Sequence, residues 1–146
     1  MLIRAYDPTY DADACLAVWR AASEAGHPFL GASALDADAV LVRDVYLPRA
    51  EIMVASDDGR LAGFLALLGT VIGGLFVDPA RHARGIGRAL VLHAAARKGA
   101  LDVEVYEENA GARAFYDRLG FVPTGRRATD DQGRPHPLVR MSRAPG

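Results

Sequence analysis

The stretch from residue 77 to residue 90, Val77-Asp78-Pro79-Ala80-Arg81-His82-Ala83-Arg84-Gly85-Ile86-Gly87-Arg88-Ala89-Leu90, decides the fold of this chain. An apolar run ends at Val77, a proline follows, and two glycines precede a helical pattern. The first N–H groups of a helix have no partner inside it, and the helix dipole adds partial positive charge there. Since Gly85 and Gly87 lack a Cβ, an anion can approach this backbone closely. Residues 81–88, the glycine turn, therefore predict either an anion site or a simple strand-to-helix turn with a solvated basic rim.

A second segment, Asn109-Ala110-Gly111-Ala112-Arg113-Ala114-Phe115-Tyr116-Asp117-Arg118-Leu119-Gly120-Phe121, completes a two-part pattern. Together the two segments resemble the GCN5-related N-acetyltransferase (GNAT) family. That family carries V-x-P and R/Q-x-x-G-x-G/A before a helix, and later N-x-x-A-x-x-F-Y-x-x-x-G-F. The order and separation of both patterns fit, and the resemblance covers nearly the whole chain. The matching residues are Val77, Pro79, His82, Gly85 and Gly87, then Asn109, Ala112, Phe115, Tyr116, Gly120 and Phe121.

The resemblance implies the GNAT fold, a mixed α/β (α+β) arrangement of about seven mostly antiparallel strands and four helices, with strands four and five parallel and splayed. Local patterns agree with it. Asp57-Asp58-Gly59 is a strong hairpin signal, and residues 101–106 alternate with a period of two. We expect residues 1–146 to form a single domain. Strands are predicted at 2–6, 51–56, 60–68, 71–77, 101–106, 122–127 and 138–142, and helices at about 11–25, from Ser33 to Pro48, from the glycine turn to 98, and from Asn109 to Gly120.

Composition excludes several classes of function. Charged residues make up 24% of the chain and nearly cancel to a net −1, so no extended basic surface for nucleic acid is expected. Cys15 is the one cysteine, which argues against a disulfide or a multi-thiolate metal site, and it falls on the inner stripe of a helix as a core thiol. No leader pattern opens the chain, which predicts a cytoplasmic protein. The uncharged run from 61 to 77 has a central turn and suits two strands better than a membrane span.

The resemblance implies acetyl-CoA as cosubstrate and no metal. Backbone amides of the glycine turn would hold the pyrophosphate, and the backbone of strand four would pair with the pantetheine arm like an added strand. His82 stands where the family has arginine or glutamine, and Arg81 or Arg84 would then supply the missing charge. The implied cofactor-binding residues are Leu75, Phe76, Val77, His82, Ala83, Arg84, Gly85, Ile86, Gly87, Arg88, Ala89, Asn109 and Tyr116.

The resemblance also makes Tyr116 the general acid that protonates the departing CoA thiolate, and the alternative is an aromatic side chain that only packs. The general base is less clear, because strand four reads Val71-Ile72-Gly73-Gly74-Leu75 and lacks the carboxylate that many members have. His27, in a loop that borders the acceptor site in this family, is the first substitute, with a structural histidine as the alternative. Weaker candidates are Glu24, Glu104, Glu107 and His136.

The function expected is transfer of an acetyl group to a primary amine of a small molecule or a peptide, by direct attack in a ternary complex. The alternative is a catalytically weak acetyl-CoA sensor. A dinucleotide-binding Rossmann protein is excluded, because its glycine turn follows the first strand of a βαβ unit and here three strands precede it. Acids at 102, 104, 107 and 108 near the mouth would favour a cationic amine, or they only solvate the surface. The acceptor and the oligomeric state, a homodimer included, stay open.

Overall fold

The computed structural model describes residues 1–82 and 84–146, and its strands follow the prediction closely. All seven predicted strands are present, the first ending one residue early and the second and last ending one residue late. In chain order the elements are β1 (Leu2–Ala5), α1 (Pro8–Gly26), η1 (Pro28–Leu30), α2 (Gly31–Leu41), η2 (Val42–Tyr46), α3 (Leu47–Arg49), β2 (Glu51–Asp57), β3 (Arg60–Leu68), β4 (Val71–Val77), η3 (Pro79–Arg81), α4 (Ile86–Lys98), β5 (Leu101–Tyr106), α5 (Ala110–Arg118), β6 (Val122–Arg127) and β7 (Leu138–Arg143).

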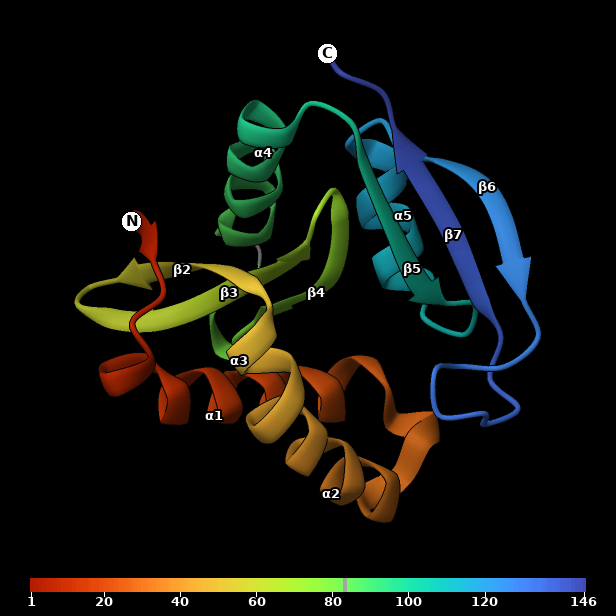
Figure 1. The fold of residues 1–146 in the computed structure, drawn as a ribbon, viewed down its shortest axis with the longest axis horizontal. Coiled ribbons are helices and arrows are strands. Elements are labelled where there is room, and N and C mark those ends of the chain that lie inside the picture. Colours follow the sequence, from red (N-terminus) through yellow and green to blue (C-terminus); the bar gives the residue numbers. More distant parts are fainter. Residues whose placement is uncertain (83) are drawn as a thin grey trace.

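The strands form one sheet in the order β1-β2-β3-β4-β5-β7-β6. Every neighbouring pair is antiparallel except β4 and β5, which run parallel. This parallel pairing joins only Val71 to Asp102 and Ile72 to Val103, after which the two strands diverge (Figure 1). The register of β4 against β3 skips Gly73, which forms a bulge where the divergence begins. The predicted splay of strands four and five is confirmed.

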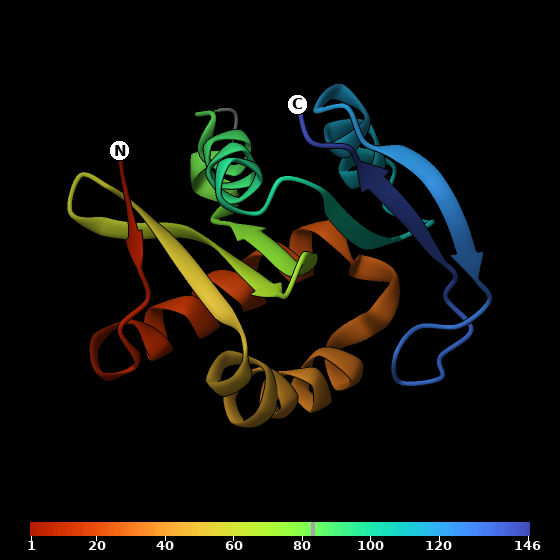
Figure 2. The ribbon, with the colours of Figure 1, turned by 45° about the horizontal axis from the view of Figure 1, so that its top comes forward.

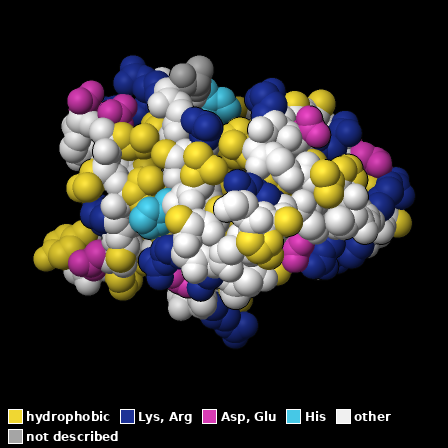
Figure 3. Space-filling view, turned by 90° about the horizontal axis from the view of Figure 1, so that it is seen from above, with side chains coloured by type: hydrophobic (Ala, Val, Ile, Leu, Met, Phe, Trp, Pro, Cys, Tyr) yellow, Lys and Arg dark blue, Asp and Glu magenta, His cyan; other side chains and the backbone are white. Residues whose placement is uncertain are grey.

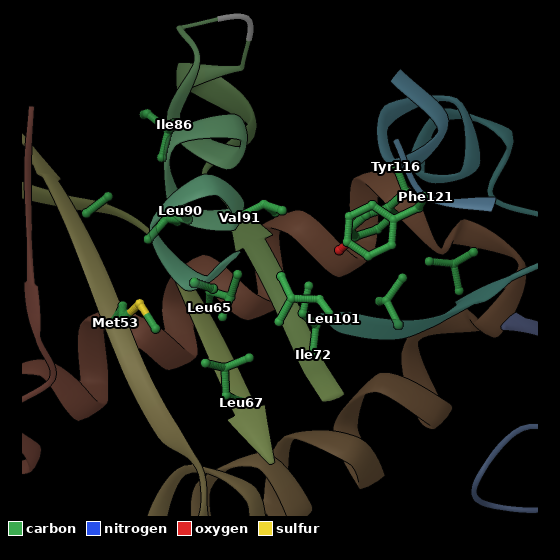
Figure 4. Close-up of a cluster of buried hydrophobic side chains, with 14 of the residues drawn as sticks. Met53, Leu65, Leu67, Ile72, Ile86, Leu90, Val91, Leu101, Tyr116 and Phe121 are labelled. Carbon is green, nitrogen blue, oxygen red and sulfur yellow. The ribbon is translucent and has the colours of Figure 1, made fainter. Parts of the chain in front are cut away.

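Helices cover both faces of the sheet (Figure 2). On one face α4 and α5 bury a cluster that includes Leu65, Leu90, Val103 and Phe121, and this cluster spans both sides of the divergence (Figure 4). On the other face α1 and α2 cover a second cluster, in which Cys15 and Trp19 pack beneath the strands. Burial raises the pKa of the Cys15 thiol to about 12, so it stays protonated at neutral pH and is the core thiol that the sequence predicts.

The helical segment before β2 differs from the prediction. It begins at Gly31, two residues before the expected cap Ser33, and it continues past Pro48 to Arg49. A π turn at 42–46 lengthens the spacing between buried side chains from four residues to five, so Leu47 faces the core and Tyr46 is exposed. Pro48 lies in the first turn of the short segment that follows, where proline is tolerated.

The other helices start and stop where their caps allow. Asp7 accepts the Thr9 N–H and Pro8 occupies the first helical turn, so α1 begins three residues earlier than predicted.

None of the described helices has the length and apolarity to cross a membrane, and the uncharged run at 61–77 forms β3 and β4. On the face carrying α4 and α5, charges of both signs alternate with hydrophobic side chains (Figure 3).

Candidate functional site

The glycine turn leaves a helix N-terminus uncapped. Gly85 is the N-cap residue of α4 with φ 76°, a left-handed conformation that favours glycine, and no described side chain caps the helix. The N–H groups of Ile86, Gly87 and Arg88 form the first turn, where intrahelical acceptors are lacking. The N–H of Ala89 donates to the Gly85 carbonyl at 3.0 Å, so this predicted phosphate contact is already occupied. The turn thus presents the short run of N–H donors on which an anion can bind.

The two glycines of the turn have different reasons to be glycine. A Cβ on Gly85 would meet no heavy atom of the described residues within 4 Å. A Cβ on Gly87 would lie 3.3 Å from the Phe115 ring and 3.6 Å from Val77. The Cβ side of Gly87 therefore faces the packing of α4 against α5, which is a separate reason for glycine at this position.

The arginines of the turn are tied to one carboxylate. Arg81 and Arg84 both donate to Oδ2 of Asp57, at 2.9 and 3.1 Å, so both guanidinium groups share their charge with one acid. His82 is exposed, and Arg88 is exposed and forms no ion pair with the described residues. The predicted contact at Ala83 lies outside the described residues.

Beside this turn, β4 presents an open backbone edge. The Asp78 N–H donates to the Ala62 carbonyl at 2.8 Å, and the register continues with Val77 opposite Gly63. Because hydrogen-bonding direction alternates along an antiparallel pair, the N–H and C=O groups of Leu75 and Val77 point away from β3. They face the side from which β5 has diverged. The ring of the intervening Phe76 packs against Phe64, with 5.4 Å between centroids.

Tyr116 and Asn109 lie on the β5 side of the same divergence. Tyr116 is 5% exposed and packs edge-on against Phe115 and Phe121, while its hydroxyl points toward β4 (Figure 4). Burial raises the pKa of this phenol, which keeps it protonated. The Asn109 side chain accepts the Ala112 N–H at 3.0 Å, which confirms the predicted cap of α5. Its Nδ2 lies against Gly26 at the end of α1.

Comparison with known proteins places this geometry in a family. The model of the acetyltransferase (GNAT) domain matches residues 48–123, and the chain is 39% identical to the peptidyl-lysine N-acetyltransferase YjaB of Salmonella typhimurium, with 86% of this chain and 87% of that protein covered. The chain belongs to the GNAT acetyltransferase family. Its structure superposes on the solution structure of apo-form YjaB from Escherichia coli with a TM-score of 0.89, at 34% identity over 99% of this chain and 98% of that one.

A more distant neighbour shares the fold of this acetyltransferase and was solved with the cofactor expected for it. It is the PaiA N-acetyltransferase of Thermoplasma acidophilum in complex with coenzyme A, at a TM-score of 0.74 and 18% identity over 98% of each chain. GNAT acetyltransferases use acetyl-CoA, and the described residues contain no group of three or more metal-ligating side chains that would hold a metal ion.

On the face of the sheet covered by α1 and α2, the acetyltransferase gathers four rings, which we call the ring cluster: His27, Phe29, Tyr106 and His136. Ring centroids are 4.8 Å apart for His27 and Tyr106 and 5.2 Å for Phe29 and His136. The cluster joins the α1–α2 connection, the end of β5 and the β6–β7 loop. Burial lowers the pKa of His27, against a smaller opposing effect of Asp38, so its imidazole is neutral at pH 7.

A buried carboxylate fastens the β6–β7 loop beside the ring cluster, and sequence reasoning missed it. Asp130 is 3% exposed and accepts the Tyr106 hydroxyl at 2.9 Å and the Arg134 N–H at 2.8 Å. The Arg134 guanidinium reaches α2, where it binds both oxygens of Asp38 at 2.8 and 2.9 Å. The sequence marks 130–137 only as turn-rich, and nothing local signals a partner 96 residues away.

The acids expected to attract a cationic amine are all paired. Asp102 binds Arg140, Glu104 binds Arg127, Glu107 binds Arg126, and Glu108 contacts His136. Each partner offsets the charge of its acid, so this group does not form the free anionic mouth that the sequence suggested. Glu24, the remaining carboxylate candidate for a base, pairs with Arg20.

Proposed function

We propose that this chain transfers the acetyl group of acetyl-CoA to a primary amine, by direct attack in a ternary complex. The observation that carries the proposal is the open edge of β4, which runs from its divergence at Gly73 to the uncapped start of α4. A linear cofactor with amides along its arm and phosphates at one end matches this sequence of donors and acceptors.

The cofactor would be bound mostly by backbone groups of β4 and of the first turn of α4, and by few side chains. Its pyrophosphate would accept from the N–H groups of Ile86, Gly87 and Arg88, and its pantetheine amides would pair with Leu75 and Val77. An N–H of this edge would donate to the thioester oxygen as negative charge develops there, a contact worth about 3 kcal/mol in comparable sites. The Nδ2 of Asn109, whose Oδ1 is used for capping, would donate to the arm.

Tyr116 would act at the sulfur. The amine nitrogen attacks the thioester carbon, the C–S bond breaks, and the Tyr116 hydroxyl gives its proton to the departing thiolate. Burial, which raises the pKa of this phenol, keeps the proton in place until a charged sulfur lies beside it. General acid catalysis of this kind contributes roughly 10²–10⁴-fold.

We propose a lysine side chain of a peptide or protein as the acceptor. The relatives from Salmonella typhimurium and Escherichia coli that support this are peptidyl-lysine N-acetyltransferases at 39% and 38% identity over most of the chain. The ring cluster, with aromatic faces beside the end of β5, suits an aliphatic stem that ends in an amine. His27 is the base that the sequence suggests first, and this role stays a prediction.

Two measurements test the proposal. Acetyl-CoA or CoA at 100 times its dissociation constant should stabilise the folded protein by about 2.7 kcal/mol, visible as a thermal shift, while NADH should give little. Thiol release from acetyl-CoA should then be followed with lysine peptides, free amino acids, polyamines and aminoglycosides. No shift with either CoA species would reject the cofactor, and a shift without transfer to any amine would favour the sensor.

A further inference from the structure

A carboxylate and an imidazole from two connections that are distant in the sequence meet beside the ring cluster. Nδ1 of His136, in the β6–β7 loop, lies 2.6 Å from Oε1 of Glu108, which precedes α5. The side chains are 23% and 39% exposed, so the pair is partly screened yet reachable from solvent. A carboxylate at Nδ1 fixes the imidazole with its proton on that nitrogen and leaves Nε2 as a proton acceptor.

We propose that His136, oriented by Glu108, is the base that removes the proton from the attacking amine. This inference rests on the proposed transfer to an amine and assigns the base that β4 does not supply. Nε2 has no hydrogen-bond partner among the described residues, and the ring lies 6.5 Å from that of Tyr106 at the end of β5. His136 therefore lies with the ring cluster on the face of the sheet opposite α4 and α5, from which we expect the amine to approach the thioester.

The carboxylates near this position are poorer bases. Both oxygens of Glu104 are bound by Arg127, at 2.8 and 3.0 Å. The Arg126 guanidinium binds Glu107 in the same two-pronged way and lowers the pKa of that carboxyl. The guanidinium groups occupy the carboxylate oxygens that would accept a proton, whereas Nε2 of His136 has no partner among the described residues. The pairing therefore favours the histidine.

His27 is the other histidine of the ring cluster, and its surroundings disfavour the same role. It packs against Phe29 and Tyr106, and burial lowers its pKa, so the protonated form that a base must reach is costly there. No described carboxylate lies within hydrogen-bonding distance of its ring, unlike that of His136. His27 thus supports the aromatic wall and leaves proton transfer to its neighbour.

The loop that carries His136 is held in place by bonds independent of the pair. The backbone N–H of His136 donates to the Arg134 carbonyl at 2.8 Å, and the Glu107 N–H donates to the carbonyl of Pro137 at 2.9 Å. Arg134 is in turn bound to Asp38 of α2 and to Asp130. The imidazole is therefore positioned before any acceptor binds, as catalysis requires.

In the step proposed, an ammonium first reaches the site and Nε2 of His136 takes one of its protons. The nitrogen lone pair then forms the N–C bond to the thioester carbon, the C–S bond breaks, and the proton from Tyr116 neutralises the thiolate. As the amide forms, the nitrogen passes its second proton through water to the Tyr116 phenolate, which restores the phenol, and solvent takes the proton from the imidazolium. Charges and protons balance without a metal or a redox partner.

The test compares His136→Asn and Glu108→Gln with matched variants on the full chain, using thiol release from acetyl-CoA with a lysine peptide. His136→Asn should lower kcat about 100-fold and Glu108→Gln about tenfold, with CoA-induced thermal shifts unchanged. The controls are His93→Asn, an exposed histidine on α4, and Glu51→Gln, an acid of β2 that pairs with Arg97 and Lys98, and both should keep wild-type kcat.

The pH profile separates a base from a structural residue. Around the imidazole lie Glu108 before α5, Tyr106 on β5, His27 at the end of α1 beyond Phe29, and Arg134 in its own loop. In His136→Asn the activity should rise steadily toward the lysine pKa near 10.4, because solution then supplies the free amine. Unchanged kcat and profile in that variant, with an active wild type, would overturn the base and leave the function standing. A wild type that acetylates nothing in the panel would reject both.

Discussion

The two sides of the β4–β5 divergence present different kinds of chemical group. At the glycine turn the groups offered to a ligand are backbone N–H and C=O groups, and the nearby arginines are bound to Asp57. At the ring cluster they are side chains, held by the buried contacts of Asp130 and Arg134. A backbone site tolerates side-chain change, such as His82 in place of the family arginine or glutamine, whereas a side-chain site changes with every substitution. On the proposed function, we expect the backbone side to bind the cofactor and the side-chain side to select the acceptor.

Tyr116→Phe should have the largest effect on activity. Tyr116 is the exception to the comparison, because we expect this side chain to act on the cofactor, which otherwise contacts backbone groups. The ring and its contacts with Phe115 and Phe121 are kept, so acetyl-CoA affinity should stay nearly unchanged. Loss of the hydroxyl proton should lower kcat by roughly tenfold to a thousandfold, measured by thiol release with a lysine peptide. Full activity with a good acceptor would leave Tyr116 only a packing role.

Gly85→Val tests whether the turn acts through its backbone. The left-handed φ of 76° should cost about 1–2 kcal/mol of unfolding free energy, and the new side chain would enter the open space beside the helix start. The CoA-induced thermal shift should fall by at least roughly half, since the donors of the first turn become shielded. Gly69→Val is the matched control, because it has φ 64° and open space but lies in the β3–β4 turn. An equal loss of CoA binding in both variants would contradict a local effect.

Arg134→Ala tests the ring-cluster side, where side chains face the expected acceptor. It removes the two-pronged bond to Asp38 and the contact with the buried Asp130, which should cost about 1–3 kcal/mol of unfolding free energy, measured by denaturant titration. KM for the peptide should rise while the CoA-induced thermal shift stays. The control, Arg43→Ala, removes an exposed pair with Asp44 and should change little.

A smaller, pH-dependent effect should come from Asp130. Burial alone would raise the pKa of this carboxyl, but the N–H of Arg134, the Tyr106 hydroxyl, the N–H of Gln132 and the Arg134 charge together hold it below its ordinary value. Stability from a lowered pKa is present above the unfolded value near 3.9 and is lost as the pH falls through the folded value. In Asp130→Asn, Tm should therefore fall less steeply with decreasing pH below about pH 4 than in the wild type. An equally steep fall of Tm in the variant would show that other carboxylates cause the acid destabilisation.

The smallest effect should come from His82→Ala. The side chain is exposed and we expect the ligand-facing groups of the turn to be backbone, so the free energies of unfolding and of CoA binding should each stay within about 0.5 kcal/mol of wild type. Isothermal titration with CoA would measure this. A loss larger than that in Gly85→Val would show that a side chain holds the phosphates after all.

Prediction from the sequence succeeded where local signals decide the structure. Period-two alternation located β5, and Asn109 marked the start of α5. It missed the π turn at 42–46, which leaves Tyr46 exposed and Leu47 buried, because no local signal in the sequence marks the change in helical spacing. The pairing of Arg81 and Arg84 with Asp57 and the packing of Gly87 on Phe115 join residues 24 or more positions apart, so they depend on tertiary structure. The site residues come from motif resemblance, and the structure adds their neighbours.

The diverging edge of β4 has a consequence for how the protein avoids other chains. A strand edge at the rim of a sheet invites pairing with foreign strands and promotes aggregation. Here the unpaired groups of Leu75 and Val77 lie in the interior of the sheet, with β5 on one side and helices over both faces. The free N–H and C=O groups of β4 therefore lie away from the rim of the sheet, where foreign strands pair, while they remain open toward the divergence from β5.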